Sequence, residues 1–147
     1  MKSTGDNSVG RFSIEFQVAN GGDVIKSIEG TLAEDQIRRF TIRGVVDSGA
    51  AWLVLPKPVA EQLGLPPGNK VKVRYADGRT RTRNTSQFAQ VEIQGRQGTF
   101  TAIIEPSRSD ALIGAVVLEG LDLLVDCLHQ RLVPRDPRFV IAEIETI

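Results

Sequence analysis

The stretch that decides the fold is VVDSGAAWLVL, residues 45–55. An apolar, β-branched run stops at the carboxylate of Asp47, and a second apolar run follows after a hydroxyl residue and small residues. This pattern predicts a buried strand that delivers one acid to a tight turn. Burying a carboxylate at the end of a valine-rich strand is costly unless it is hydrogen-bonded, paired or used in chemistry. Asp47 is therefore the first candidate functional residue.

The two residues after Asp47 suit a turn. The Ser48 hydroxyl can bond to neighbouring backbone groups, and Gly49 lets the chain turn where a Cβ would clash. Asp-Ser-Gly also occurs in ordinary turns, where Asp and Ser only satisfy backbone groups. The tripeptide alone leaves a structural role and a chemical role both open.

Composition limits the classes of protein to consider. The chain has 147 residues, of which 41% are hydrophobic, which is enough for one domain with a proper core. Eighteen basic residues balance eighteen acidic ones, so nothing favours a nucleic acid partner. No apolar run approaches the ~18 residues that span a bilayer, and residues 1–10 are polar with no signal peptide core. We expect a soluble, cytoplasmic protein with no membrane partner, a flexible segment at 1–10 and one domain at 11–147.

The chain has one cysteine, Cys127, and one histidine, His129. An internal disulfide is therefore excluded and a Cys/His zinc site is disfavoured, so we predict no metal and no cofactor. Chemistry would have to come from carboxylates, hydroxyls or lysines. Asp126 also ends an apolar run and competes with Asp47, but it lacks a following Gly turn, which favours an ordinary turn aspartate.

Hydrophobic patterning predicts mostly strands. Alternation of period two predicts a strand at 12–18, a turn at 20–23 and a second strand at 24–28. Pro56 begins a helix that Gly64 ends, with Val59, Ala60 and Leu63 on one face. Further strands are expected at 37–46, 87–93 and 99–104, in a hairpin of 121–125 with 131–133, and at 139–147.

A hairpin is expected at 71–75 and 79–83, because Asp77-Gly78 lies between two alternating segments. Six basic residues lie on its polar side. The aromatic residues expected of a single-strand nucleic acid binder are missing between them, so we interpret them as a solvated face.

Two segments together resemble the retropepsin-like, or retroviral-type, aspartic protease family. Asp47-Ser48-Gly49-Ala50 is similar to its Asp-Thr/Ser-Gly-Ala signature, and residues 111–118 are similar to its apolar-apolar-Gly segment with a following short helix. The resemblance covers residues 37–134 and points to a single-domain member of bacterial type. It implies an all-β, mainly antiparallel fold with one or two short helices, the acid protease barrel with one lobe per chain.

The resemblance also implies roles. Asp47 would be the catalytic residue of an aspartic endopeptidase. The active-site loop would be completed by Ser48, Gly49 and Ala50, and supported by Ile113 and Gly114. A flap over the substrate would have Tyr75, Ala76, Asp77 and Gly78 at its tip.

The chemistry constrains the assembly. Peptide hydrolysis by carboxylates needs two of them, one ionised to take a proton from water and one protonated to polarise the carbonyl. The chain has one Asp-Ser-Gly loop, so a second Asp47 must come from another copy. We therefore predict a homodimer that hydrolyses a peptide or protein substrate. The N-terminal strand and the strand at 139–147 are candidates for an inter-subunit sheet.

Two departures from the family pattern keep alternatives open. Ala51 stands where the family often has a polar residue that contacts the substrate backbone, and Trp52 is bulky for its place. Trp52 is either a core residue or part of the cleft. The chain could be a catalytically weak or inactive retropepsin-like module that dimerises or binds peptides, with Asp47 structural. It could also be an unrelated all-β binding domain in which both motifs are coincidental.

Overall fold

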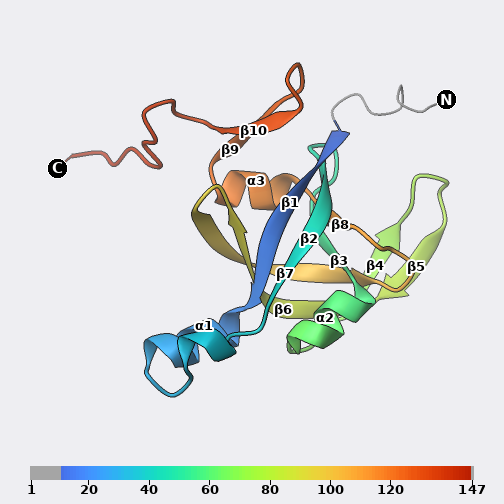
Figure 1. The fold of residues 1–147 in the computed structure, drawn as a ribbon. Helices are drawn as coiled ribbons and strands as arrows, with labels where there is room; N and C mark the ends of the chain where they lie inside the picture. The colour runs from blue at the N-terminus through green and yellow to red at the C-terminus, as the bar shows by residue number, and fades with distance from the viewer. Residues whose placement is uncertain (1–10, 147) are drawn as a thin grey trace.

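The computed structural model describes residues 11–146, and its longest strands close into a barrel (Figure 1). The predicted flexible segment at 1–10 lies outside the described residues, as does Ile147. The strands are β1 (Arg11–Asn20), β2 (Arg39–Asp47), β3 (Leu53–Pro56), β4 (Val71–Arg74), β5 (Thr80–Arg83), β6 (Thr85–Ile93), β7 (Arg96–Glu105), β8 (Ala111–Ile113), β9 (Leu123–Asp126) and β10 (Arg131–Pro134). The helices are α1 (Gly21–Ile28), α2 (Lys57–Leu63), α3 (Ala115–Gly120) and the short 3-10 helix η2 (Glu34–Gln36).

Six strands close into the barrel in the order β1-β2-β8-β3-β7-β6. Most neighbours are antiparallel, and the β2–β8 and β3–β7 pairs are parallel. The inward-facing positions are apolar: Val18, Val46, Leu53, Leu55 and Ile113 are completely buried. The expected all-β, mainly antiparallel barrel is confirmed, although the described residues contain three short α-helices instead of one or two.

The strand predicted at 24–28 is wrong, because this segment is helix α1. Its first turn is capped by Asn20, whose side-chain oxygen accepts a hydrogen bond from the Asp23 backbone N–H at 3.0 Å. An Asn followed three residues later by an acidic residue is a helix start signal, and it competes with the turn signal of the two glycines between them. The side-chain cap of Asn20 therefore favours a helix over a turn and a strand in this segment.

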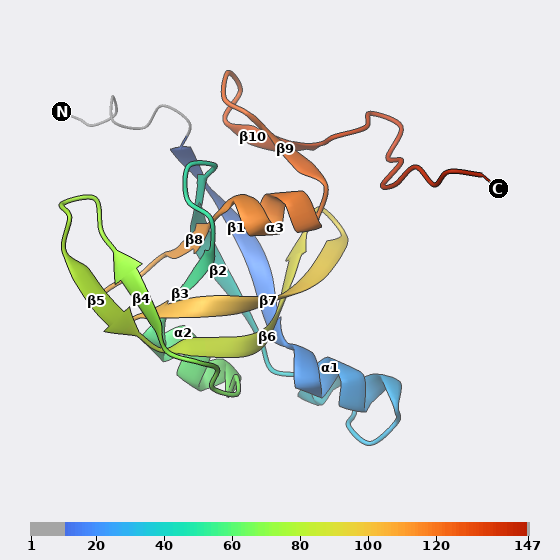
Figure 2. The same ribbon diagram turned by 180° about the vertical axis from the view of Figure 1, so that it is seen from behind.

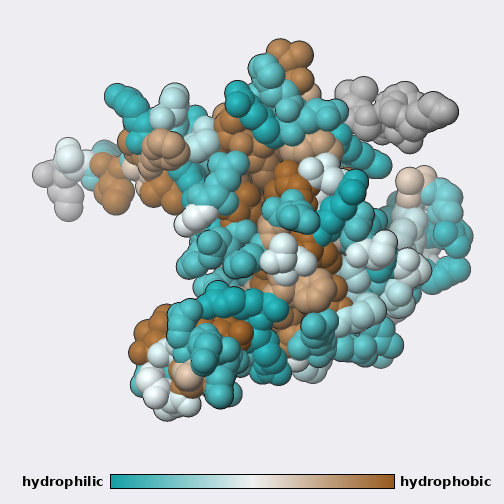
Figure 3. All heavy atoms as spheres, in the orientation of Figure 1, coloured by the Kyte–Doolittle hydropathy of each residue, from teal (hydrophilic) through white to brown (hydrophobic). Residues whose placement is uncertain are grey.

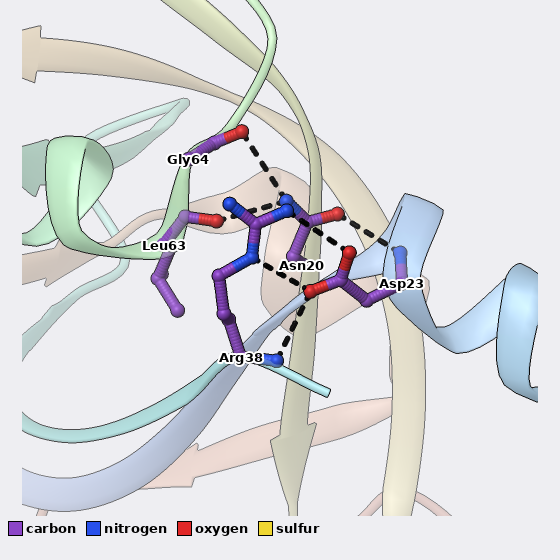
Figure 4. Close-up of polar contacts among 5 residues, drawn as sticks. All are labelled: Asn20, Asp23, Arg38, Leu63 and Gly64. Carbon is purple, nitrogen blue, oxygen red and sulfur yellow. Dashed lines mark hydrogen bonds and ion pairs between the residues drawn. The ribbon is translucent and has the colours of Figure 1, made fainter. Parts of the chain in front are cut away.

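A buried polar network joins α1 to its neighbours (Figure 4). The Arg38 guanidinium donates to both oxygens of Asp23, at 2.8 and 3.0 Å, and these bonds lower the pKa of the Asp23 carboxyl. The Asn20 amide donates to the carbonyl oxygens of Leu63 and Gly64 at the end of α2. The network ties β1, β2, α1 and α2 together at the lower end of the barrel in Figure 1.

The last strand, predicted at 139–147, is also wrong in the described part: residues 139–146 have no regular secondary structure. A strand forms only where a neighbouring backbone can pair with it, and this segment leads away from the barrel (Figures 1 and 2). Phe139, Ile141 and Ile144 are 70%, 60% and 88% exposed. Brown apolar atoms accordingly follow the C-terminal segment in Figure 3.

The other predicted elements are confirmed with small shifts of their ends. The helix after Pro56 is α2, with Val59, Ala60 and Leu63 buried and Gly64 in the left-handed conformation at its C-terminal end. The hairpins β4–β5 and β9–β10 form small sheets of their own outside the barrel. Among the helices of the described chain, none has the length and apolar character needed to cross a bilayer.

Candidate active site

Asp47 lies at the end of β2, in a loop that both flanking strands hold in place. Val46, directly before it, and Leu53, at the start of β3, are completely buried. The loop of residues 48–52 and the tip of the β4–β5 hairpin both rise toward the upper end of the molecule in Figures 1 and 2. The carboxylate is thus held between two buried strands, at the end of the barrel toward which the tip of the β4–β5 hairpin projects.

Within residues 11–146, two groups contact the Asp47 carboxylate. One oxygen, Oδ1, accepts a hydrogen bond from the Gly49 backbone N–H at 3.0 Å. The other, Oδ2, lies 3.2 Å from a guanidinium nitrogen of Arg11, which is opposite Asp47 in the β1–β2 register. The Asp47 side chain is 15% exposed. Sequence analysis missed Arg11 because only the strand register brings it to this position.

The backbone behind the loop is fixed by the start of α3. The Ala115 and Val116 N–H groups donate to the carbonyl oxygens of Ala50 and Ala51, at 2.7 and 2.9 Å. A Cβ at Gly114 would lie 2.4 Å from the carbonyl oxygen of Trp52. Only glycine permits this approach of two backbones, which explains the apolar-apolar-Gly pattern in physical terms.

The expected loop-support residues do lie against the loop. Ile113 pairs with Val46 on one side and with Leu53 on the other, so β8 joins the strands that enter and leave the loop. Ser48 is exposed, and within residues 11–146 its hydroxyl has no hydrogen-bond partner.

The expected flap is the β4–β5 hairpin. Ala76, Asp77 and Gly78 form its exposed tip, where the Gly78 N–H donates to the Tyr75 carbonyl oxygen at 2.9 Å and Gly78 has a φ of 88°. The Tyr75 side chain differs from its expected place at the tip. It points back toward the barrel and donates from its hydroxyl to Glu105, at the end of β7.

A third residue completes this anchor. The Arg83 Nε donates to the Tyr75 hydroxyl oxygen at 2.8 Å and to Glu105 Oε1 at 3.0 Å. Burial raises the pKa of Tyr75, and the hydrogen bond to Glu105 raises it further. The cluster therefore ties Tyr75, next to the tip turn, and Arg83, at the base of β5, to Glu105 of the barrel, while Ala76, Asp77 and Gly78 in the turn stay exposed.

Trp52 is not a core residue. Its side chain is 42% exposed and forms one wall of two hollows, with volumes of about 500 and 280 Å³. Trp52 therefore lies on the surface next to the Asp47 loop, where it can contact a ligand. The sequence had left this open.

Asp126, the competing carboxylate, organises a turn. It accepts hydrogen bonds from the His129 side chain and from Arg131, which hold its pKa at about 2, below the ordinary 3.8. Cys127 is exposed in the same turn. No group of three Cys, His, Asp or Glu residues in the described part of the chain is arranged to hold a metal ion.

Of three comparisons with known proteins, one identifies a family. The model of the family described as "gag-polyprotein putative aspartyl protease" matches residues 33–120, which include the Asp47 loop, the hairpin and the Gly114 segment. A comparison with curated proteins found no match. Among solved structures, the protease of simian foamy virus (mac) is 15% identical, with a TM-score of 0.46, over 73% of this chain and 91% of the viral one.

Proposed function

Because the chain belongs to the gag-polyprotein aspartyl protease family, we propose that it is a homodimeric aspartic endopeptidase of the retropepsin type. The observation that carries the proposal is the position of Asp47. Its carboxylate lies at the end of a buried strand, in a loop that Gly114 and α3 hold from behind. A structural turn aspartate needs no such support, whereas a reacting group must be held in place.

In this proposal the two copies of Asp47 in a dimer act on one water molecule. Like charges about 3 Å apart cannot both ionise, so the two carboxyls share one proton. The ionised carboxylate takes a proton from the water, which attacks the peptide carbonyl, and the protonated one donates to the carbonyl oxygen. The Gly49 N–H on Oδ1 fixes the orientation of each carboxylate.

The exposed C-terminal segment supports a dimer. A single chain leaves Phe139, Ile141 and Ile144 in water, and apolar groups of this kind favour burial against a partner. We propose that residues 139–146 become ordered in the inter-subunit contact. The expectation for the N-terminal strand is corrected: β1 is a barrel strand, paired with β2 and, from Gln17 on, with β6, so only its first part has an open edge.

One observation favours the alternative of an inactive dimerising or peptide-binding module. Arg11 lies against the oxygen of Asp47 that Gly49 leaves free, so in the described chain each oxygen of the carboxylate already has one contact. In an enzyme, the approach of the second Asp47 must displace this guanidinium. Arg11 is 56% exposed, so it can swing into solvent at little cost.

Two further predictions from the sequence stay predictions: that the chain is a member of bacterial type, and that the protein is cytoplasmic.

Cleavage of a peptide library by the purified protein tests the proposal. We expect cleavage favoured from about pH 4 to 6, inhibited by pepstatin and abolished by Asp47→Asn. Specific activity should rise with protein concentration, because only dimers are active. Asp126→Asn is the matched control, since it removes a carboxylate of the same type in a turn and should leave activity intact. A folded, dimeric wild-type protein that cleaves no peptide would favour the binding module.

A further inference from the structure

We propose that a hollow between α2 and the base of the β4–β5 hairpin is a binding site for a phosphate group. The hollow has a volume of about 340 Å³, and three cationic side chains line it, those of Lys57, Lys70 and Arg83. Lys57 begins α2, Lys70 directly precedes β4, and Arg83 ends β5. Both ribbon views show α2 beside the base of the hairpin (Figures 1 and 2). Cations from three separate segments therefore meet in one recess.

The charge in this hollow is not balanced by the protein. Its other lining residues in the described chain are polar without charge or apolar, among them Thr82 and Asn84, and none is acidic. Within residues 11–146, neither Lys57 nor Lys70 forms an ion pair. An anion that enters is therefore attracted by all three cations. A phosphate group carries nearly two negative charges at neutral pH, so it balances them better than a single carboxylate does.

Arg83 supplies donors that the protein itself leaves unused. Its Nε donates to the Tyr75 hydroxyl oxygen and to Glu105. Within residues 11–146 its two terminal nitrogens make no hydrogen bond, although the side chain is only 24% exposed. A guanidinium presents its N–H donors in a planar fork that matches the oxygens of a phosphate. An anion in the hollow can therefore bind the terminal nitrogens while Nε keeps its bonds.

A second hollow adjoins the first along α2. Its volume is about 370 Å³, and the two hollows share Lys57, Lys70, Asn84 and Ile104. The second hollow adds Ser86, which is only 7% exposed and whose hydroxyl makes no hydrogen bond within residues 11–146. It also adds a carboxylate, that of Glu61, which does not line the first hollow. The phosphate therefore belongs in the first hollow, and the second has room for the organic part of a phosphate ester.

A bound phosphate fixes the base of the hairpin. Lys57 belongs to α2, which packs on the barrel, whereas Lys70 and Arg83 lie at the two ends of the hairpin base. A phosphate that all three side chains bind joins these parts, and it also holds the guanidinium that bonds to Tyr75 and Glu105. The hairpin therefore becomes more rigid, because a ligand stabilises the ordered arrangement that binds it. This inference goes beyond the proposed function, since it concerns binding and local stability and needs no peptide cleavage.

Amide chemical shifts of the ¹⁵N-labelled wild-type protein test the site, in titrations with inorganic phosphate and with AMP at constant ionic strength. We expect saturable shifts centred on residues 57, 70 and 82–84. Adenosine, which lacks the phosphate, should cause none, and equal shifts with adenosine and AMP would overturn the site. Binding of AMP at least about threefold tighter than that of phosphate supports an ester that reaches the second hollow, and equal affinities support the free ion.

Lysine variants locate the binding. Lys57→Gln and Lys70→Gln should each weaken phosphate binding about threefold, and the double variant about tenfold, because each change removes one largely solvated charge. Lys72→Gln is the matched control. It removes the same charge from β4 at a position that lines neither hollow, and it should change the affinity less than about twofold.

Hydrogen exchange measures the effect on the hairpin. Exchange in β4 and β5 should slow in the wild type at saturating inorganic phosphate, and the same phosphate concentration should have a much smaller effect on the double variant. No saturable binding, full binding by the double variant, or equal weakening by Lys72→Gln would overturn the phosphate site. Unchanged exchange of the hairpin in the phosphate-bound wild type would contradict the part assigned to Arg83.

Discussion

Asp47 and Asp126 both end an apolar strand, yet their surroundings differ. Asp126 is surrounded by donors from its own turn, namely the backbone and ring of His129 and the guanidinium of Arg131. Asp47 receives one backbone N–H from its loop, and its other contact comes from a distant strand, through Arg11. A carboxylate bound only by its own turn has a local structural task, whereas Asp47 shares one oxygen with the exposed side chain of Arg11, which a competing group can displace.

Asp126→Asn tests the structural task of Asp126 through the pH dependence of stability. The folded-state pKa of about 2 lies below the ordinary 3.8, so the ionised form stabilises the fold above about pH 4. This contribution is lost as the pH falls toward 2. We expect the wild type to melt at a higher temperature than the variant at pH 6, and the difference to shrink between pH 4 and pH 2.

Thermal melts from pH 2 to pH 6 provide the measurement, with Asp35→Asn as the control. Asp35 is exposed and has no ion pair within residues 11–146, so the control changes the net charge equally without removing a contact. A difference between Asp126→Asn and wild type that stays constant down to pH 2 would contradict the assignment.

At the scale of single residues, the sequence predicted the features that a short local motif determines. The position of Asp47 at a strand end followed from the change between apolar and small residues, and the closeness of Gly114 to the loop followed from the resemblance. Arg11 and the hollow between α2 and the β4–β5 hairpin could not be predicted, because they depend on strand register and on how elements distant in the sequence pack together.

Among the elements, the β4–β5 hairpin combines an exposed turn with a partly buried polar cluster. The cluster joins Tyr75, next to the turn, and Arg83, at the base of β5, to Glu105 of β7. Five of the six basic residues are exposed, as a solvated face requires, and Arg79 pairs with Asp77 within the tip. The interpretation is wrong for Arg83, whose side chain is only 24% exposed and bonds to Glu105. Movement of the hairpin as a flap would therefore have to break the bond between Tyr75 and Glu105.

Tyr75→Phe tests this anchor. The ring stays, but the Glu105 carboxylate, whose side chain is only 9% exposed, loses one donor and keeps Arg83 alone. We expect the hairpin to lose about 1–3 kcal/mol of local stability, the cost of leaving a buried polar group with a missing partner. Hydrogen exchange should accelerate in β4 and β5 and stay unchanged in the barrel.

Arg81→Gln is the matched control, because Arg81 lies in the same hairpin and donates only to the neighbouring Thr80 carbonyl oxygen. It should leave hydrogen exchange of the hairpin as in the wild type. Equal exchange in Tyr75→Phe and wild type would show that the cluster does not hold the hairpin.

Elements with a clear period or a strong end signal were predictable. The helix α2 has both, and the hairpin β4–β5 has its Asp-Gly turn. Helix α1 was missed because two glycines suggested a turn, whereas the Asn20 cap and the Asp23–Arg38 ion pair stabilise a helix. Residues 139–146 have strand-like composition, but pairing needs a neighbour that the single chain does not supply.

At the scale of the whole molecule, one barrel supplies one candidate catalytic carboxylate. The central claim is that two copies of Asp47 must meet for hydrolysis. The family and the barrel fold could be predicted from the sequence, since two linked motifs fix both. The dimer could be predicted only from the chemistry, because a single chain contains no trace of the second carboxylate.

Mixing wild-type and Asp47→Asn chains tests this claim most directly. The two proteins are unfolded together in equal amounts and refolded, so that they assort at random at constant total concentration. If the active site needs Asp47 from both chains, about a quarter of the dimers are active and activity falls to about a quarter of the pure wild type. A fall to about a half, as when wild type is refolded with an inert protein that only dilutes it, would mean that each chain acts alone and would contradict the shared site.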